Sequence, residues 1–361
     1  MSVIDVARLR LVAQRLVGPR PATASGVVEH LSALQAQDLP GAIRSVGLRM
    51  GPPDRSLASA EEAVRAALAD GSVVRSWPMR GTLHLVPPAD LAWMLSLTRL
   101  RMESGAGRRR DQLGIDDALY ARACALAVAA IEQRGPLSRA ELVETWEPLG
   151  VSAVPGRAYH LIALLAMREV VVQGPPHPSR PGEQLFALFD RWIPESLRQE
   201  PEEAVAGWAA AYFRGHGPAT IKDFARWTGL PVTTARRGLA AVQDELLRLT
   251  VDGQEHWLDP ATPDLLASHG AEADAVLLLP GFDELLLGYA DRSATLPPHW
   301  AELVVPGKNG LFRPTVIHRG VAVGTWARDP GRTGQFRATP FEAFTGEQAS
   351  ALTALGVSAS T

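Results

Sequence analysis

Apolar and polar positions follow the same order more than once along this chain, and the middle stretch shows it most clearly. "GPLSRAELVETW" (135–146) begins with a turn and a Ser N-cap, has Glu141 three residues later, and continues as a short helix. "GVSAVPGRAYHLIALLAMREV" predicts a turn and a longer helix with apolar residues near helical spacing. Two strand-like runs, "VVVQG" and "EQLFALFDRW", follow on either side of "PPHPSRPG". The order of helix, turn, helix and hairpin is typical of a winged helix.

The same order is found before and after this middle copy. Residues 215–260 repeat it, with "GPATIKDF" in the place of "GPLSRAEL" and a tight "DG" turn between "LLRLTV" and "QEHWL". The first copy is less regular: "ATASGVVEHLSALQAQ" and "SAEEAVRAALADG" predict helices, and "SVVRSWPMRGTLHLVPP" predicts paired strands. The sequence therefore predicts three winged helices in tandem.

The pattern changes after residue 270. "AVLLLPGFDELLLGY", "TVIHRGVAVGTWA" and "GQFRATPFEAF" indicate strand-rich segments, and "HRG" between two apolar runs is a hairpin signal. We therefore expect an α+β fold with winged helices at 1–115, 116–200 and 201–270, followed by a β-rich segment with a hairpin at 271–361.

Composition excludes several classes of protein. Apolar residues make up 46% of the 361 residues, which is enough for a packed interior, and no apolar run is long enough for a membrane span. The N-terminus lacks the apolar run of a signal peptide, so we expect a cytoplasmic protein. Cys124 is the only cysteine, and no histidines have the spacing of a zinc helix, so we expect neither a metal nor a cofactor. The net charge of −3 does not itself indicate a nucleic-acid binder, although "RLRMESGAGRRRDQLG" (99–114) is a local basic cluster or a solvated loop.

Several segments, in this order and spacing, resemble one bacterial family. They are "LQAQD" (34–38), "RSWPMRGTLHLV" (75–86), "DFARWTGL" (223–230), "LLPGFDELLLGYADR" (278–292) and "NGLFRPTVIHRGVAVGTW" (309–326). Together they make the chain similar to the AlkZ/YcaQ family of winged-helix DNA glycosylases. The resemblance implies a concave DNA-binding surface and excision of N7-alkylated purines, including bulky adducts and interstrand crosslinks, in repair or in resistance to azinomycin-type alkylators.

The resemblance also suggests the site residues. Gln35 and Gln37 match the Gln-x-Gln motif of the family and are the predicted catalytic residues. The family also places a C-terminal β-hairpin near the lesion, and here its tip is expected at 307–310. The side chains expected to contact DNA are Arg75, Arg80, His84, Arg236, Arg237, Lys308, Asn309 and Arg313.

Other interpretations of these residues stay open. Two glutamines at a helix end are commonly solvated or capping residues, and His84, flanked by apolar residues, is also consistent with a core histidine. Pro40 is expected to end the helix that carries the glutamines, which loosens its last turn so that both amides could face one side. In a regular helix only one of them would do so.

The chemistry is compatible with amides. An N7-alkylated purine is already cationic and leaves easily, so the enzyme has to stabilise an oxocarbenium-like sugar and position a water. A glutamine carbonyl can accept a hydrogen bond from that water and place partial negative charge near the cation. The only lysines are Lys222 and Lys308, and neither is expected to form the Schiff base of a lyase, so we predict a monofunctional enzyme.

Two other functions compete with this prediction. A winged-helix transcription regulator would place basic residues on a recognition helix and would usually dimerise, whereas we expect a monomer. The helix in "PGRAYHLIALLAMREV" is too apolar to read a groove, while "TTARRGLAAVQDEL" could contact DNA. The third possibility is a protein that sequesters a drug without catalysis. Release of the alkylated base from duplex DNA separates the glycosylase from both.

Overall fold

The first group of elements in the computed structural model consists of helices followed by two long antiparallel strands. The structure describes residues 3–52, 55–180, 182–308, 310–329 and 335–360. This group contains α2 (Ala24–Leu31), β1 (Leu34–Gln35), α3 (Leu39–Gly47), α4 (Leu57–Asp70), β2 (Val74–Met79) and β3 (Thr82–Val86).

The second group repeats the order of helices and paired strands. The predicted Ser138–Glu141 capping box at the start of α8 is confirmed. The group contains η1 (Pro88–Asp90), α5 (Leu91–Gly105), α6 (Gly107–Gln112), α7 (Asp117–Arg134), α8 (Arg139–Thr145), η2 (Glu147–Leu149), α9 (Arg157–Met167), β4 (Val171–Pro176), β5 (Gln184–Leu188) and α10 (Phe189–Trp192). The basic residues 99–110 lie on α5 and α6, not in a loop.

The hairpin of the third group turns on two residues. Asp252 and Gly253 both have positive φ, as expected for the "DG" turn between its strands, so that prediction is confirmed. The group contains α11 (Pro201–His216), α12 (Ile221–Thr228), α13 (Val232–Val242), η3 (Gln243–Glu245), β6 (Leu247–Val251) and β7 (Gln254–Leu258).

The first two groups share one sheet and one core. β2 pairs with β4 through Arg75 and Gln173, which gives a five-stranded sheet of order β1-β3-β2-β4-β5. One apolar cluster runs through all three groups and includes Trp77, Trp146, Trp208 and Trp227. The groups are therefore packed as one body, because their apolar faces cover one another.

The remainder of the chain forms a second sheet that packs against the N-terminal helix α1 (Val3–Ala13). Leu11 and Val12 of α1 share a core with Leu279 and Leu285. The sheet has the order β12-β11-β10-β9-β8. The elements are α14 (Thr262–Ser268), α15 (Gly270–Ala273), β8 (Val276–Leu279), α16 (Glu284–Leu287), η4 (Pro298–Trp300), α17 (Ala301–Val304), η5 (Pro306–Lys308), β9 (Thr315–His318), β10 (Val321–Arg328), β11 (Phe336–Pro340), α18 (Gly346–Ala354) and β12 (Val357–Ala359).

The hairpin predictions for this part have different outcomes. "HRG" does turn β9 into β10, with positive φ at Arg319 and Gly320. "FDELLL" forms the short helix α16, so the strand expected there is wrong. No strand flanks the expected hairpin tip at 307–310 within the described residues, because α17 and η5 precede it. The antiparallel pairing of β10 with β11 is longer than the pairing of β9 with β10.

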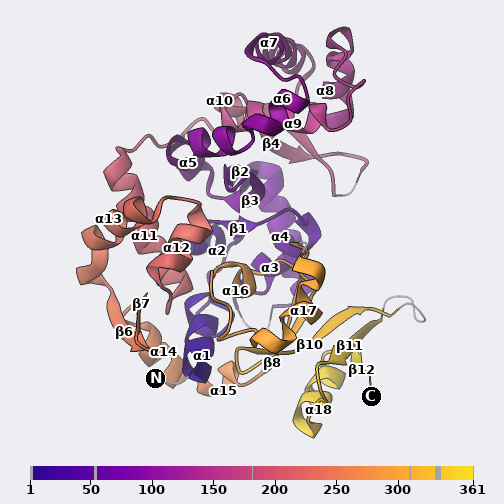
Figure 1. Cartoon of the computed structure of the whole chain (residues 1–361). Coiled ribbons are helices and arrows are strands. Elements are labelled where there is room, and N and C mark those ends of the chain that lie inside the picture. Colours follow the sequence, from indigo (N-terminus) through magenta and orange to yellow (C-terminus); the bar gives the residue numbers. More distant parts are fainter. Residues whose placement is uncertain (1–2, 53–54, 181, 309, 330–334, 361) are drawn as a thin grey trace.

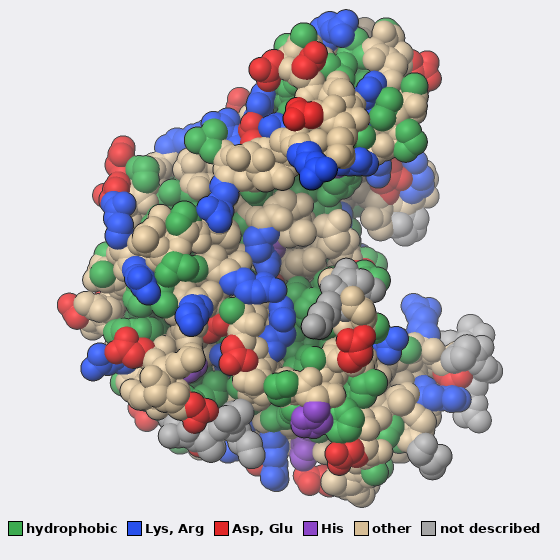
Figure 2. Space-filling model, in the orientation of Figure 1, with side chains coloured by type: hydrophobic (Ala, Val, Ile, Leu, Met, Phe, Trp, Pro, Cys, Tyr) green, Lys and Arg blue, Asp and Glu red, His purple; other side chains and the backbone are tan. Residues whose placement is uncertain are grey.

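The elements of the chain are arranged in an arc (Figure 1). α5–α9 lie at the top of the view, α11–α13 at its left, and β8–β12 at the bottom and lower right (Figure 1). Figure 2 shows Lys and Arg side chains gathered in the middle of the same face, between these parts. None of the described helices is both long and apolar enough to cross a membrane.

Candidate functional site

The segment with the two glutamines forms the edge of the first sheet. Gln35 ends β1 and lies opposite His84 of β3, so the helix end expected here is wrong. The N–H of Ala36 donates to the carbonyl of Leu83 at 2.8 Å, and the carbonyl of Ala36 accepts from Arg75 Nε at 2.9 Å. Pro40 does not end a helix; it lies in the first turn of α3, where its missing N–H costs no hydrogen bond.

The two glutamine side chains differ in exposure and in the backbone N–H that each accepts. Gln35 is 8% exposed, whereas Gln37 is exposed at the surface. Gln35 Oε1 accepts from the backbone N–H of Gln37 at 3.2 Å, and Gln37 Oε1 accepts from the N–H of Leu83 at 3.2 Å. Each carbonyl oxygen keeps a second lone pair, and neither Nε2 group donates to another described residue. Each amide oxygen is thus oriented by one hydrogen bond, and only the amide of Gln37 is exposed to solvent.

The buried carboxylate of Glu284 holds the backbone of this segment through a hydrogen bond. Its Oε1 accepts the N–H of Gln35 at 2.9 Å, and its Oε2 accepts from Trp227 Nε1 at 3.0 Å and lies 3.5 Å from His216 Nε2. Burial alone would raise the pKa of this carboxyl, but His216 and the Gln35 N–H stabilise the charged form and lower the pKa to about 2. Glu284 is therefore a carboxylate at neutral pH, which suits a structural acceptor and not a proton donor.

A buried ion pair lies next to Glu284. Asp283 receives two hydrogen bonds of 2.8 Å from Arg49, and both side chains are fully buried. Ser45 Oγ also donates to Asp283 Oδ2 at 2.6 Å. Because α3 runs to Gly47, this pair links the α3 region to the 278–292 segment. Asp291 and Arg292 form no such pair in the described structure; both line a cavity instead.

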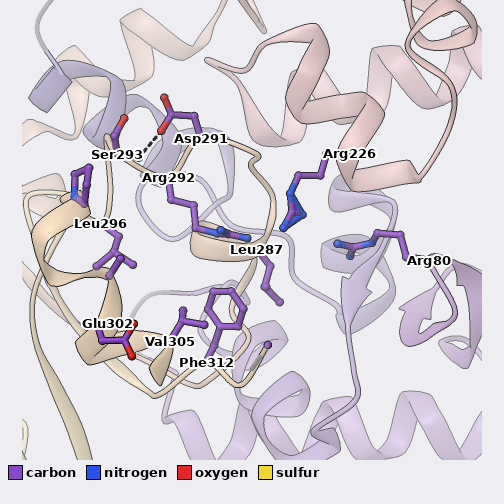
Figure 3. A pocket seen from close by; sticks show the side chains of 13 residues that line it. Arg80, Arg226, Leu287, Asp291, Arg292, Ser293, Leu296, Glu302, Val305 and Phe312 are labelled. Atoms are coloured by element: carbon purple, nitrogen blue, oxygen red, sulfur yellow. Dashed lines mark hydrogen bonds between the residues drawn. The ribbon is translucent and has the colours of Figure 1, made fainter. Parts of the chain in front are cut away.

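Three arginines from separate parts of the chain meet at this cavity of about 550 Å³ (Figure 3). Arg80 comes from the β2–β3 turn, Arg226 from α12, and Arg292 from the segment after α16. Burial, and after it the charges of Arg226 and Arg80, lower the pKa of Arg292 to about 10. None of the three forms a salt bridge with a carboxylate of a described residue. The cluster therefore favours an anion.

Arg80 also lines a second hollow of about 380 Å³. This hollow lies between the β2–β3 turn, α5 and the end of α12, and Arg101 and Gly229 are among its residues. The basic surface thus continues from the three arginines toward the arginines of α5. Neither Gln35 nor Gln37 is among the described lining residues of the two hollows.

Two of the predicted DNA contacts are buried in the first sheet. Arg75 is 9% exposed, and its nitrogens donate to Ala36, Gln173 and the Gln37 carbonyl, so it holds the glutamine segment and has no face turned to a phosphate. His84 is fully buried, and burial together with the charge of Arg80 lowers its pKa to about 3. His84 is therefore a neutral core histidine that supports Arg80 through a 3.1 Å contact.

The other predicted contacts are dispersed. Arg236 and Arg237 are exposed on α13 outside the arginine cavity, and Arg237 pairs with Glu202 at 2.7 Å. Arg313 is exposed, and its guanidinium donates to the Leu303 carbonyl at 3.3 Å. Asn309 lies outside the described residues. Lys308 ends η5.

Sequence reasoning missed Arg226 and Arg292 as members of the basic surface. Both lie within segments that carried the family resemblance, "DFARWTGL" and "GYADR". The available signal in the sequence was a basic residue between two apolar ones, Ala225 and Trp227; in the structure Arg226 is exposed and both neighbours are buried.

Comparison with known proteins identifies the family. The profile of the family described as "DNA glycosylase AlkZ-like" matches residues 28–358. The chain belongs to this family. The AlkZ-like chain is therefore an enzyme that acts on DNA.

Curated proteins and solved structures both offer a match to this AlkZ-like chain from Streptomyces sahachiroi. A curated protein named "Interstrand DNA cross-link repair glycosylase" is 30% identical over 329 residues, which is 84% of this chain and 82% of the relative. The solved structure of the DNA glycosylase AlkZ is 28% identical, with a TM-score of 0.77 over 98% of this chain and 94% of the other. The α+β fold is thus that of AlkZ.

Proposed function

We propose that this chain is a monofunctional DNA glycosylase that hydrolyses the N-glycosidic bond of N7-alkylated purines, bulky adducts and interstrand crosslinks included. The observation that carries the proposal is the Gln-x-Gln segment, whose backbone is held by Glu284, Arg75 and the Gln35 side chain. Through His84, which lies opposite Gln35 and contacts Arg80, this segment is connected to the arginine-lined cavity. The name of the Streptomyces relative supports crosslinks as substrates.

The site suits a reaction that needs little acid catalysis. The leaving purine is already cationic, so no proton donor has to be supplied, and Glu284, His84 and Arg75 are all used structurally. What remains is stabilisation of the oxocarbenium-like sugar and alignment of a water. The free lone pair of a fixed amide oxygen can do both without reorganising during the reaction.

The two glutamines have different tasks in this proposal. Gln37, which is exposed, contacts the water or the sugar directly. Gln35, which is buried, holds the N–H of Gln37 and thereby sets the position of the residue that acts. A catalytic group held in this way acts from one geometry, which is the condition for efficient positioning.

DNA would lie along the arginine-lined hollow. We infer that the three helix–hairpin groups are winged helices, and that Arg80, Arg101, Arg226 and Arg292 contact phosphates. Helix α9 of the second group is not placed to read bases, because residues 161–167 are buried. We expect a monomer whose binding depends on salt and hardly on sequence.

A duplex with one N7-methylguanine or one N7-linked crosslink tests the function. We expect release of the free alkylated base, with an intact abasic strand that is cut only after alkali treatment. Borohydride should trap no covalent adduct, because only two lysines are present and Lys222 is exposed on α12. Binding without base release would instead favour a regulator or a drug-sequestering protein.

Arg226→Gln tests the assigned DNA surface. The variant should weaken binding to undamaged duplexes of different sequence by a similar factor and reduce the slope of log K against log salt by about one phosphate contact. Fluorescence anisotropy across a salt series measures both. Arg237→Gln is the matched control, since Arg237 is paired with Glu202 outside the cavity. An equal loss in both variants would contradict the assignment.

A further inference from the structure

The cavity with the three arginines combines two surfaces of different chemistry. One part is basic, with Arg80, Arg226 and Arg292 (Figure 3). The other is apolar and is formed by Leu287, Leu296, Pro298, Ala301, Val305 and Phe312. Its volume of about 550 Å³ falls within the range of small-molecule sites, roughly 300–1,000 Å³. A ligand that fits must offer both an anion and an uncharged apolar group.

The charge of the cavity excludes the damaged base itself. An N7-alkylated purine carries a positive charge, which the three guanidinium groups would repel. Two carboxylates, Asp291 and Glu302, also line the cavity, so one net positive charge remains against the three arginines. Each carboxylate accepts a local backbone N–H, from Ser293 and Gly307 respectively. The basic part is therefore suited to a backbone phosphate, and the apolar part to a neutral substituent.

The cavity adjoins the glutamine segment through shared elements. α16 has Glu284, which holds the N–H of Gln35, at its first position, and Leu287, which lines the cavity, at its last. Phe312 of the apolar wall packs on Phe282, with ring centroids 5.8 Å apart. Arg80, at the basic end, contacts His84, which lies opposite Gln35 in the sheet. The same elements, α16 and the β2–β3 hairpin, therefore support both the glutamine segment and the cavity.

We propose that the apolar wall binds the uncharged substituent that a bulky lesion carries on purine N7, while the arginines bind an adjacent phosphate. The cavity then determines how well the enzyme accepts aromatic or extended substituents compared with a methyl group. This inference rests on the proposed glycosylase function and identifies a specificity site within it.

Filling the cavity tests the inference. Ala301→Phe places a ring in the apolar part, and Leu303→Phe is the matched control on the same short helix α17, because Leu303 is 40% exposed and is not a lining residue. Single-turnover base release is measured on duplexes with one N7-benzylguanine or one N7-methylguanine. The ratio of the benzyl to the methyl rate should fall about tenfold or more in Ala301→Phe, as expected when an apolar group loses its pocket. The ratio in Leu303→Phe should equal that of the unmodified enzyme.

The outcomes separate the inference from the proposed function. An unchanged ratio in Ala301→Phe, or an equal fall in both variants, overturns the specificity site while the glycosylase function stands. Failure of the unmodified enzyme to release either base overturns the function, and the inference with it. Val305→Met, which narrows the same cavity with a flexible side chain, replaces Ala301→Phe if circular dichroism shows that Ala301→Phe does not fold.

Discussion

Gln37→Ala should lower the single-turnover rate of base release by about 10²–10³-fold, which is the usual effect of removing one preorganised polar group that stabilises a transition state. The side chain is exposed and its Oε1 is fixed by the Leu83 N–H, so its removal takes away a directed dipole without opening the core. The melting temperature should therefore stay nearly unchanged. Gel-based excision assays and thermal denaturation measure the two effects.

Comparison with Gln35→Ala separates the two roles. That variant also removes the acceptor of the Gln37 N–H, so excision should fall and the free energy of unfolding should drop by about 1–3 kcal/mol. Gln37→Glu is the control. Its carboxylate still accepts the N–H of Leu83, but a negatively charged oxygen replaces the amide NH₂ group. The site assignment is wrong if excision stays at the unmodified rate in both alanine variants.

Asp283→Ala should be the most destabilising of the variants considered. It leaves Arg49 fully buried without its two hydrogen bonds to the carboxylate, and loss of one partner of a buried pair costs about 3–5 kcal/mol. The free energy of unfolding in urea measures the loss.

The double variant Arg49→Met/Asp283→Leu shows whether the loss comes from an uncompensated charge. Replacing both ions by apolar groups removes the buried charge, so much of the stability should return. A loss below about 1 kcal/mol in Asp283→Ala alone would match an exposed pair instead, and would contradict the burial described above.

Much of the architecture followed from local signals. The helix-and-hairpin order, the capping box at Ser138 and the turns at "DG" and "HRG" depend on residues within a few positions of one another, and all appear in the structure. Such features are predictable because capping and tight turns use particular side chains and backbone angles.

The glutamine segment was harder because its structure depends on distant residues. β1 is only two residues long, and it pairs with β3 about fifty residues later. Its other partners are Arg75 and Glu284, and no local pattern indicates them. The convergence of Arg80, Arg226 and Arg292 has the same origin: three surface arginines become one site only when the groups pack together.

The pairing of β2 with β4 limits how this protein can be shortened. Arg75, which holds the backbone beside Gln37, itself binds Gln173 of the second group at 2.9 Å. A truncated chain without the second group would lose that bond and expose the edge of β2. We therefore expect that minimal active versions cannot be made by deleting a repeat, and that recombination between relatives should exchange the first two groups as one block.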